Sequence, residues 1–115
     1  MNQFQLMINM VDSLMLSLQE HSEAFPIQKN NCDRVISLIT EYGNVAFQNQ
    51  NWAGHITASM LVINTERTRV LLMFHKKLQF WLQFGGHSDG NSDTLATAIR
   101  EFHEESGIQI EPEII

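Results

Sequence analysis

Residues 85–108, which read GGHSDGNSDTLATAIREFHEESGI, organise the rest of the chain. The stretch opens on a glycine pair, continues as a polar loop and ends in a segment whose apolar residues recur at helical spacing. At about 100° per residue, one side of this helix collects four apolar side chains. They are Leu95, Ala98, Ile99 and Phe102. The spacing predicts a helix that packs on a core through this side.

The ends of the helix are also marked in the sequence. Asn91, Ser92 and Asp93 are candidate N-caps, because a short side-chain oxygen can accept a hydrogen bond from a free N–H of the first turn. Gly107 is the expected end, since glycine enters the left-handed conformation after a helix at no steric cost.

The other side of the helix is acidic in an unfavourable pattern. Glu101 is three and four residues from Glu104 and Glu105, the spacings at which like charges repel. Glu104 and Glu105 also occupy the last turn, where the helix dipole disfavours anions by roughly 0.3–1 kcal/mol each. A bound divalent cation would reverse the sign of these terms. Oxygen ligands alone favour Mg²⁺ or Mn²⁺ over Zn²⁺.

This stretch resembles the Nudix box, here at residues 86–108. The box has Gly, five residues, Glu, seven residues, then Arg-Glu-(bulky apolar)-x-Glu-Glu-x-Gly-(bulky apolar). Gly86 matches its opening glycine. The closing run is matched without a gap by Arg100, Glu101, Phe102, Glu104, Glu105, Gly107 and Ile108. The first glutamate of the box falls on Ser92, for which Asp89 or Asp93 could stand in through a shifted loop.

The residues before the box extend the likeness. Residues 81–90, WLQFGGHSDG, are similar to a Nudix subgroup with a Trp-Leu-Gln-Pro-Gly-Gly-His-x-Asp-Gly signature, in which Phe84 replaces the proline. The resemblance implies an α/β (α+β) fold, a Nudix-like α/β/α sandwich with a mixed sheet. Because such domains continue for several more strands and a helix, we expect the sandwich to be incomplete at the C-terminus and the chain to be truncated.

The resemblance also implies an activity, hydrolysis of a phosphoanhydride bond in a nucleoside diphosphate linked to another group. Glu101, Glu104 and Glu105, with the carbonyl of Gly86, would hold Mg²⁺ or Mn²⁺, and Arg100 would position a glutamate. Glu104 or Glu105 would act as the base through water. Candidate substrate contacts are Lys76, Lys77, Trp81, His87 and Asp89.

The first part of the chain reads as a helical segment, residues 1–49, ahead of the first half of a Nudix domain at 50–115. Apolar residues recur at three- and four-residue steps from Phe4 to Leu18, and Pro26 breaks the pattern. A second helix is expected from Asn30 or Asn31 to Gly43. Residues 55–64 and 69–75 read as a hairpin, the second strand apolar enough to be buried on both faces. Residues 108–110 alternate like the start of a strand.

The charge and cysteine content of the chain bear on its partners and its cellular location. A net charge of −6 over 115 residues argues against nucleic acid or an anionic membrane. Cys32 has no second cysteine to pair with, which favours a small buried residue in a reducing, cytoplasmic setting. No basic start marks a secretory signal. An unpaired strand at the edge of an incomplete sheet would favour a homodimer.

Two other functions remain open from the sequence. Ser92 and the short C-terminal part favour a catalytically weak or inactive Nudix-like module that binds a nucleotide or a protein. An acidic interaction domain without metal would explain the charges but not their unfavourable spacing.

Overall fold

The computed structural model describes residues 3–109 and 113–114, with side chains from residue 10 onward. The chain divides into two compact units. A helical unit contains residues 1–56 and 88–93, and an α/β unit contains residues 57–87 and 94–115. The helical unit thus includes residues 50–56 and 88–93. The sequence had predicted that the helical segment ends at residue 49.

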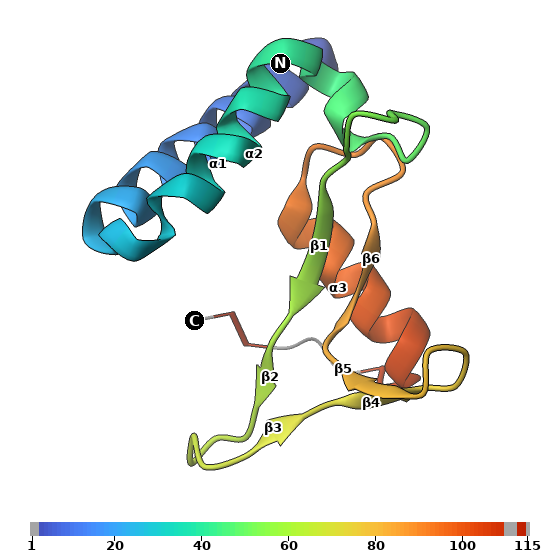
Figure 1. Cartoon of the computed structure of the whole chain (residues 1–115). Helices are drawn as coiled ribbons and strands as arrows, with labels where there is room; N and C mark the ends of the chain where they lie inside the picture. The colour runs from blue at the N-terminus through green and yellow to red at the C-terminus, as the bar shows by residue number, and fades with distance from the viewer. Residues whose placement is uncertain (1–2, 110–112, 115) are drawn as a thin grey trace. The chain divides into compact units, whose positions relative to one another are not determined.

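Two helices that run side by side make up most of the helical unit (Figure 1). They are α1 (Gln3–Ala24) and α2 (Lys29–Tyr42), joined by the short 3₁₀ helix η1 (Pro26–Gln28). Pro26 ends the first helical pattern as predicted, since its ring is tolerated only in a first turn. Cys32 is buried, as expected of a small structural residue.

The core of the helical unit lies at the end of α2. A second 3₁₀ helix, η2 (Gly43–Phe47), buries Ala46 and Phe47 completely beside Ile39. Residues 88–93 join this core through hydrogen bonds to backbone carbonyls of Phe47 and Ile56. Gly90 N donates to Phe47 O at 2.9 Å, and Ser88 Oγ donates to Ile56 O at 2.8 Å.

The α/β unit is built from short antiparallel strands and one helix. The strands are β1 (Thr57–Met60), β2 (Val62–Ile63), β3 (Val70–Leu71), β4 (Met73–His75), β5 (Phe80–Leu82) and β6 (Phe84–His87), followed by α3 (Thr94–Ser106). They form three two-stranded ladders, β1–β6, β2–β3 and β4–β5. The predicted hairpin of residues 55–64 with 69–75 is confirmed only next to its turn, where Val62 lies opposite Leu71 and Ile63 opposite Val70. The outer parts of the two segments, β1 and β4, pair with β6 and β5 instead.

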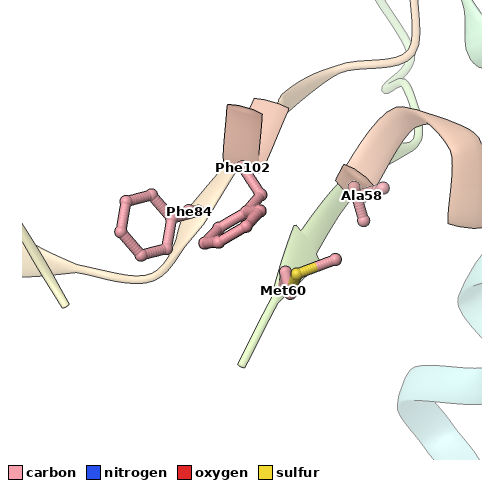
Figure 2. Packing of buried hydrophobic residues seen from close by; sticks show 5 residues of the cluster. Ala58, Met60, Phe84 and Phe102 are labelled. Atoms are coloured by element: carbon pink, nitrogen blue, oxygen red, sulfur yellow. The ribbon is translucent and has the colours of Figure 1, made fainter. Parts of the chain in front are cut away.

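The core of the α/β unit lies between α3 and the β1–β6 ladder. Ala58 and Met60 of β1 alternate with exposed residues and face the helix, as a strand with one buried face requires. Phe84 of β6 meets Phe102 of α3 edge to face, with ring centroids 5.3 Å apart (Figure 2). The predicted apolar side of the helix is confirmed at Ala98 and Phe102, which are buried, but is wrong at Leu95, which is 49% exposed.

The prediction that residues 69–75 form one strand buried on both faces is wrong. The segment is interrupted at Leu72, and Val70, Leu71 and Phe74 are all exposed. Burial on both faces needs a layer above and below the strand. In the described part of the chain, β3 and β4 each pair with a single strand, and neither two-stranded ladder has covering layers on both faces.

The fold class is therefore α+β, as predicted. All ladders among residues 3–109 are antiparallel, and the mixed sheet and three-layer sandwich stay predictions. Of the expected strand at 108–110, Ile108 and Gln109 are not in a strand, and Ile110 lies outside the described residues. Within those residues, no helix combines the length and the apolar character needed to cross a membrane.

Candidate functional site

The sequence motif comes together where α3 packs on β6. The helix ends as predicted at Gly107, whose φ is 70° and whose N–H donates to His103 O at 3.1 Å. At the other end, Asn91 Oδ1 accepts a hydrogen bond from the backbone N–H of Asp93, which shapes the turn into the helix. Arg100, Glu101, Glu104 and Glu105 thus lie on the part of α3 that faces the glycine pair.

The glycine pair lies in a strand that precedes the polar loop. Gly85 and Gly86 are the middle residues of β6, opposite Ser59 and Ala58 of β1. A Cβ built on Gly86 would lie 2.5 Å from Glu101 Oε1. The absence of a side chain at residue 86 is therefore what allows the Glu101 carboxylate to lie against the strand.

Glu105 reaches the same strand one residue earlier. Its Oε1 accepts a hydrogen bond from the backbone N–H of Gly85 at 2.8 Å. Charge strengthens such a bond, since a carboxylate is a stronger acceptor than a neutral oxygen.

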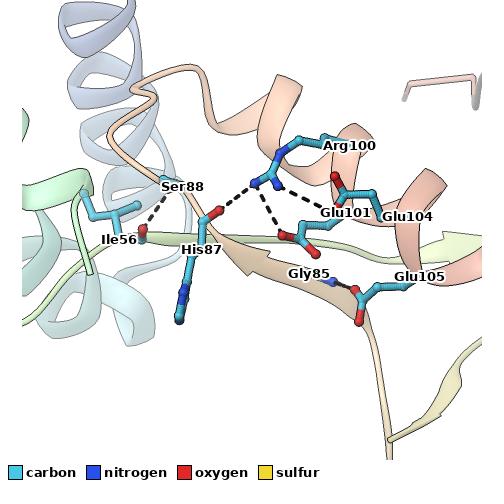
Figure 3. A network of polar contacts seen from close by, with 8 residues as sticks. All are labelled: Ile56, Gly85, His87, Ser88, Arg100, Glu101, Glu104 and Glu105. Carbon is cyan, nitrogen blue, oxygen red and sulfur yellow. Dashed lines mark hydrogen bonds and ion pairs between the residues drawn. The ribbon is translucent and has the colours of Figure 1, made fainter. Parts of the chain in front are cut away.

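Arg100 joins the strand to two of the glutamates (Figure 3). Its Nη2 donates to His87 O at 2.7 Å and lies 3.3 Å from Glu101 Oε1. Its Nη1 lies 3.6 Å from Glu104 Oε2. The side chain of Glu101 is 15% exposed and that of Glu104 is 58% exposed, so only the first of these ion pairs is well shielded from water.

The glutamates do not form one cluster in this arrangement. Within the described range, no group of three or more His, Cys, Asp or Glu side chains has the geometry of a metal site. The donor set is nevertheless of the type that Mg²⁺ or Mn²⁺ takes, carboxylate oxygens and a backbone carbonyl. The space beside Gly86, which a Cβ would fill, also gives Glu101 access to the backbone. These residues fit such an ion in chemistry, while Glu105 is held separately by Gly85.

Ser92 takes the place of the first glutamate of the box. Its side chain is 3% exposed and belongs to the helical unit, so the residue itself supplies neither a carboxylate nor an accessible oxygen. Asp89, proposed as its substitute and as a substrate contact, is exposed in the same segment and has a φ of 51°.

An open groove of about 640 Å³ lies on the face of the β1–β6 ladder away from α3. Thr57 and Ser59 line it because they alternate with Ala58 and Met60, which face the helix. Of the predicted substrate contacts, Trp81 and His87 line this groove, as does Gly86. Lys76 and Lys77 lie in the exposed turn between β4 and β5 instead.

Sequence reasoning missed three polar residues of the groove, Thr57, Ser59 and Gln83. Alternation of polar and apolar residues in residues 57–60, TASM, was the available signal for the first two. The β4–β5 hairpin was also missed. Its turn, Lys76 to Gln79, contains no Gly, Pro, Asn or Asp, and Gln79 itself takes the left-handed conformation with a φ of 59°.

Comparison of the chain with protein-family models, with curated proteins and with solved structures gives no match.

Proposed function

We propose that the chain is a metal-dependent hydrolase of the Nudix type, which cleaves a phosphoanhydride bond in nucleoside diphosphates linked to another group. One observation carries the proposal. Arg100 ties the carbonyl of His87 to Glu101 and approaches Glu104, so β6, the arginine and these two glutamates form one connected set of groups.

In this proposal the chain's own residues bind and orient. Arg100 holds Glu101 in place, because its planar fork can contact a carbonyl and carboxylates together. Gly86 leaves room for the Glu101 carboxylate at the strand. Glu104 is the more exposed of the two glutamates that pair with Arg100, so it is accessible to take a proton from water as the base.

Glu101, Glu104 and Glu105, with the carbonyl of Gly86, would hold Mg²⁺ or Mn²⁺. When bound, such an ion would neutralise phosphate charge and lower the pKa of a water molecule attached to it. The Gly85 N–H bond occupies one oxygen of Glu105, and its second oxygen would serve as the ligand. The mixed sheet of a Nudix sandwich belongs to the same proposal.

The experiment is a hydrolysis assay with a panel of nucleoside diphosphate derivatives, in Mg²⁺, in Mn²⁺ and in chelator. Nucleoside monophosphate release is measured by chromatography for the chain and for Glu101→Gln. We expect metal-dependent turnover that falls by about 100-fold in the variant, since the amide is a poor metal ligand. Glu41→Gln, an exposed glutamate on α2, is the matched control and should keep full turnover. Equal rates for Glu101→Gln and the chain would refute the proposal.

A second candidate function is a binding module of the same family without turnover. Two observations favour it. Ser92 is buried where the box has its first glutamate, and Glu105 is held by Gly85 whereas Glu101 and Glu104 both pair with Arg100. This candidate predicts saturable nucleotide binding by calorimetry with no product release under any metal. Turnover in the assay above would exclude it.

A further inference from the structure

We propose that the open groove on the β1–β6 ladder binds a planar nitrogen heterocycle, such as a nucleobase, stacked on the indole of Trp81. The inference adds to the proposed function, because it names the part of a nucleotide that binds in this groove. It rests on the proposed function only in treating the ligand as a nucleotide.

The residues that line the groove favour an uncharged ligand. Among the described residues that line it there is no Asp, Glu, Lys or Arg. The basic side chains of the unit before α3 lie in the two hairpin turns and beside them, at Arg67, Arg69, Lys76 and Lys77. A phosphate placed in the groove would meet neither a lysine nor an arginine, and His87 is the one ionisable side chain among these lining residues. A neutral ring system needs no basic partner.

Trp81 supplies an aromatic face for that ring. It is 66% exposed, although tryptophan has one of the largest apolar surfaces of any side chain. Its indole is supported from the opposite strand by Phe74, with ring centroids 5.3 Å apart and planes tilted by 59°. Stacking on an exposed, supported indole favours every base, because each base has a π-face.

The polar residues of the groove distinguish a heterocycle from a plain apolar ligand. Thr57 and Ser59 present hydroxyls on this face, and Gln83 presents an amide. Each of these groups can both donate and accept hydrogen bonds. The edge of a nucleobase carries both donors and acceptors, so this set of neutral groups complements it.

The glycine pair lines the groove where β6 lies against β1. A Cβ on Gly85 would lie 2.6 Å from Ala58 O and 2.7 Å from Ser59 Oγ, so glycine at this position lets β6 lie close to β1. Gly86 borders both regions, because it lines the groove and also lies against the Glu101 carboxylate.

Trp81 also provides a direct readout. The chain has two tryptophans, and Trp52 is 99% exposed in the helical unit, so Trp52→Phe leaves Trp81 as the sole tryptophan at little structural cost. Adenosine, guanosine, cytidine and uridine are titrated into this variant in chelator, with ribose 5-phosphate in parallel. We expect saturable quenching of Trp81 fluorescence by at least one nucleoside and none by ribose 5-phosphate.

Two matched variants then locate the binding, with the affinity for the best nucleoside measured by equilibrium dialysis. Trp81→Leu should weaken it about tenfold or more. Phe80→Leu should change it less than about twofold, because Phe80 is as exposed, at 65%, but is not part of the groove. Both side chains are on the surface, so unchanged far-ultraviolet circular dichroism is expected for each.

Quenching by no nucleoside, equal quenching by ribose 5-phosphate, or equal losses in Trp81→Leu and Phe80→Leu would each overturn the inference. The titration needs neither metal nor turnover. Nucleoside binding without hydrolysis would leave this inference standing while the proposed hydrolase falls, and hydrolysis without quenching would do the reverse.

Discussion

Gly85 donates its backbone N–H to Glu105 Oε1 at 2.8 Å, on the side of β6 away from its partner β1. A side chain of α3 thus takes a hydrogen-bonding position that a further strand would occupy. Edge strands with unpaired N–H groups invite pairing with other chains. The same carboxylate that the sequence marks as a metal ligand therefore also covers part of a strand edge.

Loss of the Gly85–Glu105 hydrogen bond should destabilise the protein, and more so in Glu105→Ala than in Glu105→Gln. Glu105→Ala leaves the half-buried N–H of Gly85 without its acceptor and should lower the free energy of unfolding by about 1–2 kcal/mol. Glu105→Gln should cost less, because the amide oxygen still accepts but without the charge. Urea unfolding measures both.

Glu104→Ala is the control for that series, because it lies on the same turn and its contact with Arg100 is an exposed ion pair. It should change the free energy of unfolding by less than about 0.5 kcal/mol. If Glu104→Ala and Glu105→Ala are equally destabilising, the Gly85 bond contributes nothing specific.

The two glycines should respond differently to the same substitution. Gly85→Ala places a Cβ 2.6 Å from Ala58 O and 2.8 Å from Ser59 Cα, both backbone atoms, so the strands must separate. We expect a loss of about 1–3 kcal/mol in the free energy of unfolding. Gly86→Ala meets the end of the flexible Glu101 side chain instead and should cost less than half as much.

The cost of Gly86→Ala should depend on Glu101. In a double-mutant cycle, Gly86→Ala in the Glu101→Ala background should be nearly neutral, since the group it meets is gone. Urea unfolding of the four proteins gives the coupling energy. A cost that is the same in both backgrounds would mean that the Cβ at residue 86 is opposed by something other than the carboxylate.

Thr97 gives a prediction in the opposite direction. It is 1% exposed on α3, and its Oγ1 has no hydrogen-bond partner among the residues that the structure describes. Thr97→Val keeps the shape and removes the unsatisfied hydroxyl, so it should raise the free energy of unfolding by about 1 kcal/mol. Thr97→Ser keeps the hydroxyl, loses a methyl group and should lower it. A destabilised Thr97→Val protein would show that the hydroxyl is bonded in solution.

Local patterns predicted the helices well and the strands in part. Pro26, Gly43 and Gly107 act within a few residues of themselves, so their effect on helix ends can be read from the sequence. The exposure of Val70 and Phe74 could not be read in this way, because burial depends on which layers cover a strand and not on its own residues.

The candidate site shows the same division. Arg100 and Glu104 are four residues apart, a spacing that brings two side chains together on any helix, and they pair on α3. The contacts of Glu101 with Gly86 and of Glu105 with Gly85 depend on how the helix packs across β6, which no local pattern specifies. The groove was missed for a related reason, since its residues come from both strands of the β1–β6 ladder and from β5.

Arg100 tests whether shape or charge matters at this site. Arg100→Lys keeps the positive charge, but one ammonium cannot contact His87 O, Glu101 and Glu104 as the guanidinium does. If the proposed hydrolase is correct, metal-dependent turnover should fall by about tenfold or more, as for other groups that orient metal ligands. The side chain is 40% exposed, so the free energy of unfolding should change by less than about 0.5 kcal/mol.

Arg34→Lys, an exposed arginine on α2, is the matched control and should alter neither quantity. Turnover retained in Arg100→Lys would mean that a positive charge near the glutamates suffices and that the contact with His87 O has no positioning role.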